Sequence, residues 1–435
     1  MKKDGSIEFE TIKSHKNRLY FLCGFVCVVV LLIIFVVTRS HAKYRVTQSI
    51  HLVNGTINYS LPDLNIVGLY IDGEEATELD SNKKYVLDTT QSTCTYKDGS
   101  EISDLTISYD SETGGLSISP YTTKGTKCTL YFEEYVEPIR NVLLANYPTQ
   151  LTRSSFSSTV TNTTTGTIYY EDTSKGTTYY FAGNPTDNWV KFADKYWRII
   201  RINEDGTLRL IYSGEESAQT TGTGTQIGTS SFNNSYDNNA YVGFKYTTNN
   251  VHGTGTNSTI LNELNEWYQD NLSSYADKID GNAGFYNDRT PYSGNGLGTS
   301  ATDYAAYNRL ENNKQPSFEC SNSSDLFTTS GSSQGNKALT YPIGLITADE
   351  VAFAGGVYRQ DNTSYYLYTN GYYWTMSPRF FFSGNAFVFY VNSDGQLYSN
   401  MGVYTANSVR PVINLRSDVI ISSGDGTSSN PYVVN

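Results

Sequence analysis

The stretch WVKFADKYWRIIRINEDGTLRLIYSG, residues 189–214, indicates three consecutive β-strands separated by two tight turns. Asp205-Gly206 marks the second turn, because both residue types tolerate the positive φ that a hairpin turn requires. This stretch lies in a region, residues 167–435, where further strand patterns surround two helical ones, STILNELNEWYQDNLSSY (258–275) and TADEVAFAGG (347–356). Thr347 and Glu350 have the Thr-x-x-Glu spacing of a capping box, which predicts the start of the second helix. Strands around two helices, with many irregular loops, predict an α+β fold.

The preceding region, residues 44–136, indicates a small all-β module. Strand-like alternation begins at Tyr44 and leads to Asn54-Gly55, a pair typical of hairpin turns. Further strand patterns follow without a convincing helix. Cys94 and Cys128 both fall in predicted strands, so we expect a disulfide between them. Two separately buried thiols are the alternative.

Residues 137–166 are expected to link the two regions. They begin with a short helical turn or docking segment, PIRNVLLANYP. The second half, TRSSFSSTVTNTTTG (152–166), is rich in Ser and Thr and has almost no apolar content. Such a composition is typical of a linker.

An apolar segment precedes both regions. LYFLCGFVCVVVLLIIFVV, Leu19 to Val37, has no charged residue and nearly spans a hydrocarbon layer of ~30 Å. Basic residues are more numerous before it than after it, which predicts a signal anchor over 19–38 with residues 1–18 in the cytoplasm. A signal peptide cleaved near Ser40 to Ala42 is the alternative. We therefore expect a single-pass protein of the cell membrane with an extracellular C-terminal region.

The composition argues against several kinds of partner. The formal net charge of the 435 residues is −12, so the chain is a poor partner for nucleic-acid phosphates, and no nucleic-acid partner is expected. The histidines and cysteines have no spacing that indicates zinc. The Asp-Gly turns lack the acidic first ligand of calcium loops. We expect neither a metal nor another cofactor.

Five motifs between about residues 168 and 418 resemble, in order, those of a family of uncharacterised bacterial surface-protein domains. They are YWRIIRINEDGTLRLIYS, STILNELNEWYQDNL, YPIGLITADEVAFAG, YYWTMSP and SVRPVINL. The family belongs to the formylglycine-generating-enzyme branch of the C-type-lectin-like fold, so the resemblance implies a C-type-lectin-like domain over 167–435. Relatives often carry a Cys where this chain has Tyr286, which implies that Cys320 lacks a disulfide partner.

The sequence does not indicate catalysis. The family's copper-dependent oxidation needs two active-site cysteines, and this region has Cys320 alone. GSSQG (331–335) matches a Gly-x-Ser-x-Gly pattern, but its flanks are polar and no His follows Ser333. We therefore expect no catalytic residue. An enzyme of unidentified chemistry and a structural surface component are the alternatives to a binding protein.

Aromatic residues concentrate in YYWTMSPRFFFSGNAFVFYVNSDGQLYSN, residues 372–400. The AFVFYV part has the alternation of a core strand, whereas RFFF, between Pro378 and SGN, has the composition of a turn. Tyr, Ser, Gly, Asn and Arg together are typical of recognition loops. We predict an exposed surface that binds an extracellular protein or glycan in recognition or adhesion; loops that merely cover the core are the alternative. The candidate residues are Arg379, Phe380, Phe381, Phe382, Asn385, Tyr398, Asn400, Met401, Tyr404 and Asn407.

Overall fold

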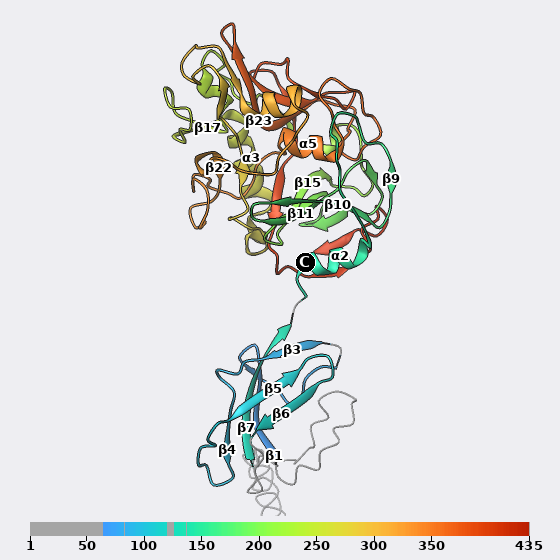
Figure 1. Cartoon of the computed structure of the whole chain (residues 1–435), viewed down its shortest axis with the longest axis vertical. Coiled ribbons are helices and arrows are strands. Elements are labelled where there is room, and N and C mark those ends of the chain that lie inside the picture. Colours follow the sequence, from blue (N-terminus) through green and yellow to red (C-terminus); the bar gives the residue numbers. More distant parts are fainter. Residues whose placement is uncertain (1–63, 82, 120–125, 136, 435) are drawn as a thin grey trace, which may run out of the picture. The chain divides into compact units, whose positions relative to one another are not determined.

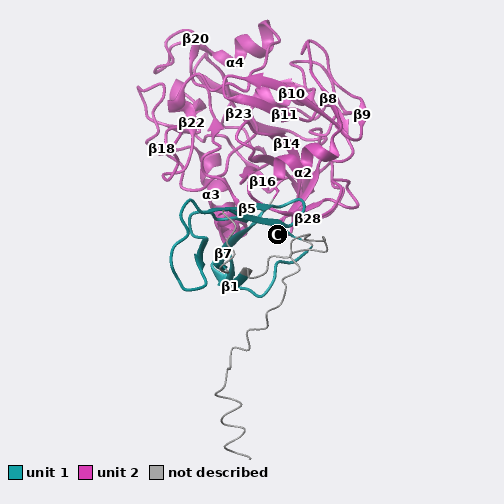
Figure 2. Cartoon of the chain, turned by 60° about the horizontal axis from the view of Figure 1, so that its bottom comes forward, with its two compact units in different colours: residues 1–135 teal, residues 136–435 magenta. Residues whose placement is uncertain are grey.

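The computed structural model describes residues 64–434, except for 82, 120–125 and 136. It divides the chain into two compact units, Met1–Tyr135 (unit 1) and Val136–Asn435 (unit 2), as Figures 1 and 2 show. Each unit has a hydrophobic core of its own. The predicted cytoplasmic tail, 1–18, and the predicted anchor, 19–38, lie outside the described residues.

The prediction of a single-pass membrane protein with an extracellular C-terminal region is not supported. Among the residues that the structure describes, no helix is long and apolar enough to cross a membrane. Helix α3 (Thr259–Asn271) has 13 residues, whereas a membrane span needs about 20 apolar ones. The segment on which the prediction rested, Leu19 to Val37, is not among the described residues.

Unit 1 is built on a five-stranded sheet and a separate hairpin. In the sheet, β1 and β7 run parallel at the centre, β2 extends the β1 side, and β3 and β4 both pair antiparallel with β7. β5 and β6 form the hairpin. The strands are β1 (Leu64–Ile71), β2 (Glu74–Glu75), β3 (Lys84–Leu87), β4 (Thr93–Tyr96), β5 (Thr106–Asp110), β6 (Gly115–Ser119) and β7 (Thr126–Tyr135).

Cys94 of β4 and Cys128 of β7 form the predicted disulfide, which the structure confirms. The two residues lie opposite each other in the antiparallel ladder, with their Cα atoms 4.1 Å apart. Both are buried in the core of unit 1. Because the bridge closes a loop with a sequence separation of 34, the chain-entropy estimate gives it ~3–4 kcal/mol of stabilisation.

The three strands predicted within residues 189–214 form the centre of a nine-stranded sheet in unit 2. Ala193 and Asp194, with φ of 54° and 55°, make the first turn, and Gly206 takes φ 84° in the second. The order is β28-β29-β13-β14-β11-β10-β8, and β15 pairs with both β14 and β27. The strands are β8 (Thr149–Leu151), β10 (Thr167–Thr173), β11 (Gly176–Tyr180), β13 (Trp189–Phe192), β14 (Lys195–Ile202), β15 (Leu208–Gly214), β27 (Val412–Leu415), β28 (Ile421–Ser423) and β29 (Tyr432–Val434).

A second, seven-stranded sheet of unit 2 carries the aromatic C-terminal segment. Its order is β16-β26-β23-β21-β20; β24 also pairs with β23, and β25 extends β24. The strands are β16 (Gly228–Ser230), β20 (Pro291–Ser293), β21 (Thr302–Tyr304), β23 (Tyr373–Phe382), β24 (Asn385–Val391), β25 (Leu397–Tyr398) and β26 (Asn407–Val409). The short pairs are β9 (Thr163–Thr164) with β12 (Asn184–Pro185), β17 (Lys245–Tyr246) with β18 (Thr256–Asn257), and β19 (Phe285–Tyr286) with β22 (Leu326–Phe327).

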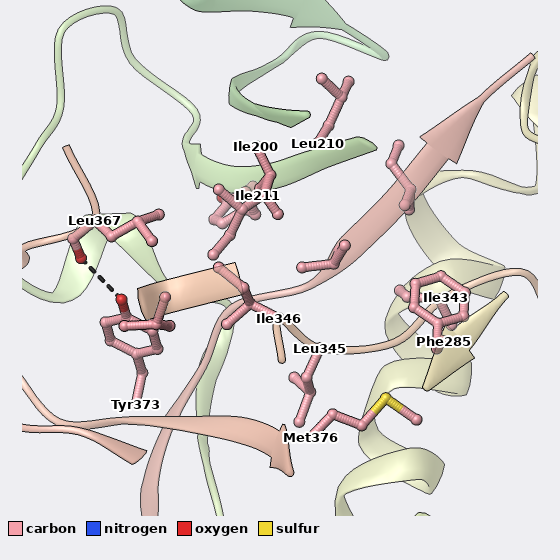
Figure 3. Packing of buried hydrophobic residues seen from close by; sticks show 14 of the residues in the cluster. Ile200, Leu210, Ile211, Phe285, Ile343, Leu345, Ile346, Leu367, Tyr373 and Met376 are labelled. Carbon is pink, nitrogen blue, oxygen red and sulfur yellow. Dashed lines mark hydrogen bonds between the residues drawn. The ribbon is translucent and has the colours of Figure 1, made fainter. Parts of the chain in front are cut away.

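One hydrophobic core joins the two large sheets of unit 2 (Figure 3). Ile211 contributes from β15 of the first sheet, and Met376 from β23 of the second. Leu345 and Ile346 of the connecting segment belong to the same cluster. Tyr373 makes a hydrogen bond within this core: its hydroxyl donates to the carbonyl oxygen of Leu367 at 2.9 Å. The two sheets are therefore held by shared burial.

The helices of unit 2 are short. The two predicted helices form as α3 and α5 (Ala348–Ala354), and α5 begins at the predicted capping box of Thr347 and Glu350. Gly355 ends it at φ 110°. The remaining helical segments are α2 (Ile139–Asn146), α4 (Ala305–Tyr307), η1 (Thr223–Thr225), η2 (Asn239–Val242), η3 (Ser273–Lys278), η4 (Asn308–Asn312) and η5 (Ser323–Asp325).

The prediction of an α+β fold with a transmembrane helix is therefore wrong for the residues that the structure describes. The C-type-lectin-like assignment of residues 167–435 stays a prediction. Of the residues that the structure describes, 37% lie in strands and 14% in helices, so this part of the chain is mostly β. The helix content is low because the two predicted helices are short, with 13 and 7 residues. The polar stretches between them, expected to be irregular, contribute short strand pairs instead.

Residues 137–166 pack as part of unit 2 rather than as a free linker. Ile139, Leu143 and Tyr147 are fully buried in its core. β8 then pairs with β10, and β9 pairs with β12. The Ser/Thr-rich composition suggested a linker, but this segment forms strands, because the backbone hydrogen bonds of a strand do not require apolar side chains.

Candidate functional site

The predicted binding segment Arg379 to Asn385 is a strand end and a hairpin turn, not a loop. β23 continues through Phe382, and the ladder pairs Phe380 with Phe387, Phe381 with Ala386 and Phe382 with Asn385. Ser383 and Gly384 alone make the turn, with φ of 50° and 75°. Two residues with positive φ suit a tight hairpin, so the pairing persists to the end of β23.

Strand alternation divides these aromatic residues between two faces. Phe381 points into the core and is 1% exposed, whereas Phe382 is 62% exposed. Phe380 shares the outward face with Phe382 and stacks on Phe387 of β24, with ring centroids 4.3 Å apart. The outward face therefore carries rings that do not belong to the buried core.

Tyr404 adds a further exposed ring beside the hairpin turn. It is 52% exposed, and its ring centroid lies 4.8 Å from that of Tyr236. The backbone brings these tyrosines to β24: Ala386 N donates to Tyr236 O at 2.8 Å, and Val403 N donates to Ala386 O at 3.0 Å. Three chain segments thus converge at the turn.

Arg379 lies half-buried on the same strand. Its Nε is 2.8 Å from Glu311 Oε1, and its Nη1 is 2.9 Å from Asp303 Oδ1. Burial by itself lowers the pKa of Arg379, but the Glu311 and Asp303 carboxylates outweigh it and raise the pKa. The guanidinium carbon lies 4.2 Å from the Tyr307 ring centroid and 4.1 Å from that of Phe380.

We call this group of residues the hairpin face. Tyr292 of β20 extends it, because its exposed ring lies 6.1 Å from that of Tyr307. The members share outward or half-buried side chains around the end of the β23–β24 hairpin. The hairpin face consists of Tyr236, Tyr292, Tyr307, Arg379, Phe380, Phe382, Asn385, Phe387 and Tyr404.

The remaining four predicted residues contact side chains outside the hairpin face. Tyr398 stacks on Tyr358 at 5.8 Å, and Asn400 accepts a hydrogen bond from the hydroxyl of Tyr390. Asn407 is buried, and its Nδ2 donates to the sulfur of half-buried Met401 at 3.5 Å. The structure therefore brings together only part of the predicted set.

A cavity of about 290 Å³ with many charged side chains in its wall forms a second candidate site in unit 2, which the sequence does not predict. Its wall comes from the β10–β11 and β14–β15 turns, the segments 282–288 and 317–320, and the first turn of α5. Arg309 of η4, Leu326 of β22, Gln334 and Ser377 of β23 complete it. The charged residues of the wall are Lys175, Arg201, Glu204, Asp205, Arg209, Asp288, Arg309, Glu319, Asp349 and Glu350.

One buried ion cluster on the wall joins β14, β15 and α5. Glu350 Oε1 lies 3.1 Å from Arg201 Nε and 2.6 Å from Arg209 Nε. Its other oxygen accepts the Thr347 N–H at 2.9 Å. Burial by itself raises the pKa of Glu350, but Arg209 and Arg201 outweigh it and hold the pKa below its usual value. Glu350 is therefore ionised at neutral pH.

A second ion cluster holds η4 against α5. Arg309 Nε and Nη2 bind both oxygens of Asp349 at 2.9 and 3.0 Å. Its Nη1 lies 2.7 Å from Asp288 Oδ2. Asp349 also accepts the Ser317 N–H at 3.0 Å, which places the segment that carries Cys320 at the cavity. Such bidentate pairs fix geometry as well as charge.

Cys320 is a free thiol that lines the cavity. Burial raises its pKa to about 12, so the unreactive thiol form predominates at neutral pH. Burial also raises the pKa of Tyr286, whose hydroxyl lies 3.1 Å from Ser321 Oγ. General acid–base catalysis works best with a pKa near the operating pH. The pKa shifts of Cys320, Tyr286 and Glu350 all move away from that range.

The sequence contained one local signal of the cavity. The capping box of Thr347 and Glu350 was recognised, but a capping Glu on an exposed helix end would face water. In the structure, Glu350 is buried against Arg201 and Arg209, which lie more than 100 positions away in the sequence. Its neighbour Asp349 is buried against Arg309. Spacing alone could not show that proximity.

The comparisons with known proteins returned no relatives. No family model matches the chain, and no curated protein or solved structure matches it significantly. The resemblance to the formylglycine-generating-enzyme branch is neither supported nor refuted by them. Within the described part of the chain, no group of three or more His, Cys, Asp or Glu side chains is placed to hold a metal ion.

Proposed function

We propose that unit 2 is a recognition domain that binds a protein partner through the hairpin face, without catalysis. The observation that carries the proposal is the cluster of exposed rings around the hairpin turn, above all Phe382 and Tyr404. Tyr and Arg are prominent among the residues that dominate binding energy in protein interfaces, and Phe is enriched there. Rigid rings also lose few torsions on binding, so they bind at low entropic cost.

A protein partner suits the hairpin face better than a small polar ligand. The Nε and both Nη atoms of Arg379 already contact Glu311 or Asp303. The face therefore offers aromatic surface more than free hydrogen-bonding groups. Large apolar side chains of a partner would bury that surface, at about 25 cal/mol per Å² of apolar area.

The test is a protein microarray probed with the full chain under oxidising conditions, followed by affinity measurements on the strongest partner. We expect Phe382→Ala and Tyr404→Ala each to weaken binding by ~1–3 kcal/mol. Tyr372→Ala is the matched control, since Tyr372 is 40% exposed and immediately precedes the opposite end of β23. Equal losses in all three variants, or unchanged affinity in the first two, would refute the proposal.

A further inference from the structure

The cavity of unit 2 carries an inference that is independent of the hairpin face. Six acidic and four basic side chains line it, so its wall has an excess of two negative formal charges. Its volume of about 290 Å³ lies at the small end of the range for ligand sites, about 300–1,000 Å³. A hollow with an excess of one sign of charge attracts ions of the opposite sign. The cavity therefore favours a small cation.

The basic side chains of the wall are already matched by carboxylates. All three arginines bind carboxylates in the two ion clusters. Lys175, the remaining basic residue, is exposed. Hydrogen bonds from Ser174 and the charge of Lys175 together hold the pKa of Glu319 below its usual value, so these two opposite charges lie near each other. An anionic ligand would have to compete with a carboxylate of the protein at each basic group.

Glu204, by contrast, is a largely buried carboxylate without a close partner. Its side chain is 16% exposed and lies in the turn between β14 and β15. Within the described part of the chain it accepts no hydrogen bond: Oε2 lies 3.6 Å from Arg201 Nη1, and Arg201 is held more closely by Glu350, at 3.1 Å. An ionised carboxylate that loses water without gaining hydrogen bonds is unfavourable. A cationic donor in the cavity would supply those hydrogen bonds.

Asp205, the next residue of the turn, presents a second open acceptor. Its Oδ1 accepts the N–H and the hydroxyl of Thr207 at 3.0 and 2.6 Å, whereas its Oδ2 accepts no hydrogen bond from any described residue. The backbone of the turn is fixed from outside, because Arg140 Nη1 donates to Glu204 O at 3.3 Å. Two consecutive carboxylates are thus held in place on the cavity wall.

We propose that this cavity binds a small organic dication with primary ammonium groups, an aliphatic diamine in chemical terms. An ammonium group has three donors and no acceptor, and its hydrogen bonds to carboxylates are stronger than those between neutral groups. One ammonium group binds Glu204 and Asp205. The other is attracted to the second ion cluster, where Asp288 and Asp349 share a single arginine. Both ion clusters keep their own contacts and act as a rigid frame.

A diamine suits this wall better than a metal ion does. The acidic side chains are distributed along the wall, and no three of those that the structure describes are placed to hold a metal ion together with or without His or Cys. A diamine carries its two charges at separate points. Its aliphatic chain can lie against the apolar part of the wall, which includes Ala283, Phe318 and Leu326.

Calorimetric titration of the full chain tests the ligand class. Putrescine, 1,4-butanediol and succinate share a four-carbon chain but carry a double positive charge, no charge and a double negative charge. We expect putrescine to bind, and the diol and the dianion to bind at least about tenfold more weakly. Added salt should weaken the binding of putrescine, because it screens the attraction. No binding of putrescine at millimolar concentration, or equal binding of the diol or of succinate, would overturn the proposal.

Substitution of Glu204 locates the site. Glu204→Gln removes the negative charge at nearly the same size and should weaken putrescine binding at least about tenfold. Glu215→Gln is the matched control: Glu215 is 72% exposed, contacts Lys195 and follows the other end of β15. We expect it to bind as wild type does. Unchanged affinity of Glu204→Gln, or an equal loss in Glu215→Gln, would place the diamine elsewhere and overturn the assignment.

Cys320 supplies a second measurement that does not depend on the folding of the Glu204 variant. Alkylation of its thiol with N-ethylmaleimide under long incubation places a bulky group on the cavity wall and should abolish putrescine binding. Cys320→Ala, treated with the same reagent, should bind as the untreated protein does. Unchanged affinity of the alkylated wild-type chain would overturn the assignment. Phe382→Ala should retain putrescine binding, so failure of the hairpin-face proposal is distinguishable from failure here.

Discussion

Phe381 and Phe382 are consecutive residues at the end of β23, yet 1% of the first and 62% of the second is exposed. The alternation of a strand sends successive side chains to opposite faces, and the ladder with β24 maintains that alternation up to the turn. One ring therefore belongs to the core of unit 2 and the other to the hairpin face.

We predict that substitution of these two residues separates stability from binding. Phe381→Ala should lower the free energy of unfolding by ~3–5 kcal/mol, because it opens a cavity in the core. Phe382→Ala should change it by less than ~0.5 kcal/mol, because its ring is largely exposed. Chemical denaturation of both variants measures the difference. Similar losses in the two would show that the outward face is packed.

The charge of Glu350 is predicted to stabilise unit 2. Glu350→Gln keeps an acceptor for the Thr347 N–H but leaves Arg201 and Arg209 without their shared carboxylate. We expect a loss of ~3–5 kcal/mol, as for other buried pairs that lose one partner. Glu204→Gln is the control: its contact with Arg201 is longer, 3.6 Å, and Arg201 keeps its contact with Glu350, so we expect a smaller loss. Denaturant unfolding measures the free energy of unfolding of both variants. Equal losses would contradict the conclusion that the Glu350 carboxylate stabilises unit 2.

The same carboxylate predicts a pH dependence. Its folded pKa lies below the usual value of 4.5, so the unfolded state binds more protons near that pH. The contribution of Glu350 is full above pH about 4.5 and is lost as the pH falls through the folded pKa. The stability of unit 2 should therefore fall with acidification more steeply in wild type than in Glu350→Gln. Parallel pH profiles in thermal unfolding would contradict this.

Reduction of the disulfide should act on unit 1 alone. Breaking the link between Cys94 and Cys128 should cost ~3–4 kcal/mol and shift one calorimetric transition to lower temperature. The transition of unit 2 should stay in place, since the two units have separate cores. A variant with both cysteines replaced by Ala should show the low transition without reductant. A shift of both transitions on reduction would mean that the units do not unfold independently.

Cys320 should react slowly while unit 2 is folded. With a pKa of about 12, only a minute fraction is thiolate at pH 8, so a disulfide reagent should modify it at least ~10-fold more slowly than in denaturant. Cys320→Ala supplies the background from other thiols. A folded-state rate equal to that in denaturant would show that the thiol is not shielded as described.

The strands of unit 2 were partly predictable from local pattern. Residues 189–214 carry apolar side chains and turn residues in an order that only a hairpin meander satisfies, and they fold so. The prediction of a loop at Arg379 to Phe382 was wrong, because three consecutive Phe residues show no alternation of apolar and polar side chains. In the strand, Phe381 faces the core, whereas Phe380 and Phe382 face outward. What separates them is the backbone ladder, which side-chain composition does not record.

The cavity illustrates the opposite case. Arg201, Arg309 and Glu350 lie in separate stretches of sequence, and none belongs to a motif that indicates an ion cluster. Their proximity arises because β14, η4 and α5 meet in three dimensions. Only the capping box at Thr347 was visible beforehand, and it indicates a helix start rather than a site.

The pairing of β29 with β13 has a consequence for how unit 2 forms during synthesis. β13 lies next to β29 in the parallel direction, and Ile139 N, near the start of the unit, donates to Ser417 O at 3.2 Å. The nine-stranded sheet therefore cannot close until residues 432–434 have left the ribosome. Contacts of such long sequence separation slow folding, and they leave sheet edges exposed in the nascent chain. We expect unit 1 to become protease-resistant in nascent chains that have not yet exposed β29, and unit 2 to do so only once residues 432–434 are outside the ribosome.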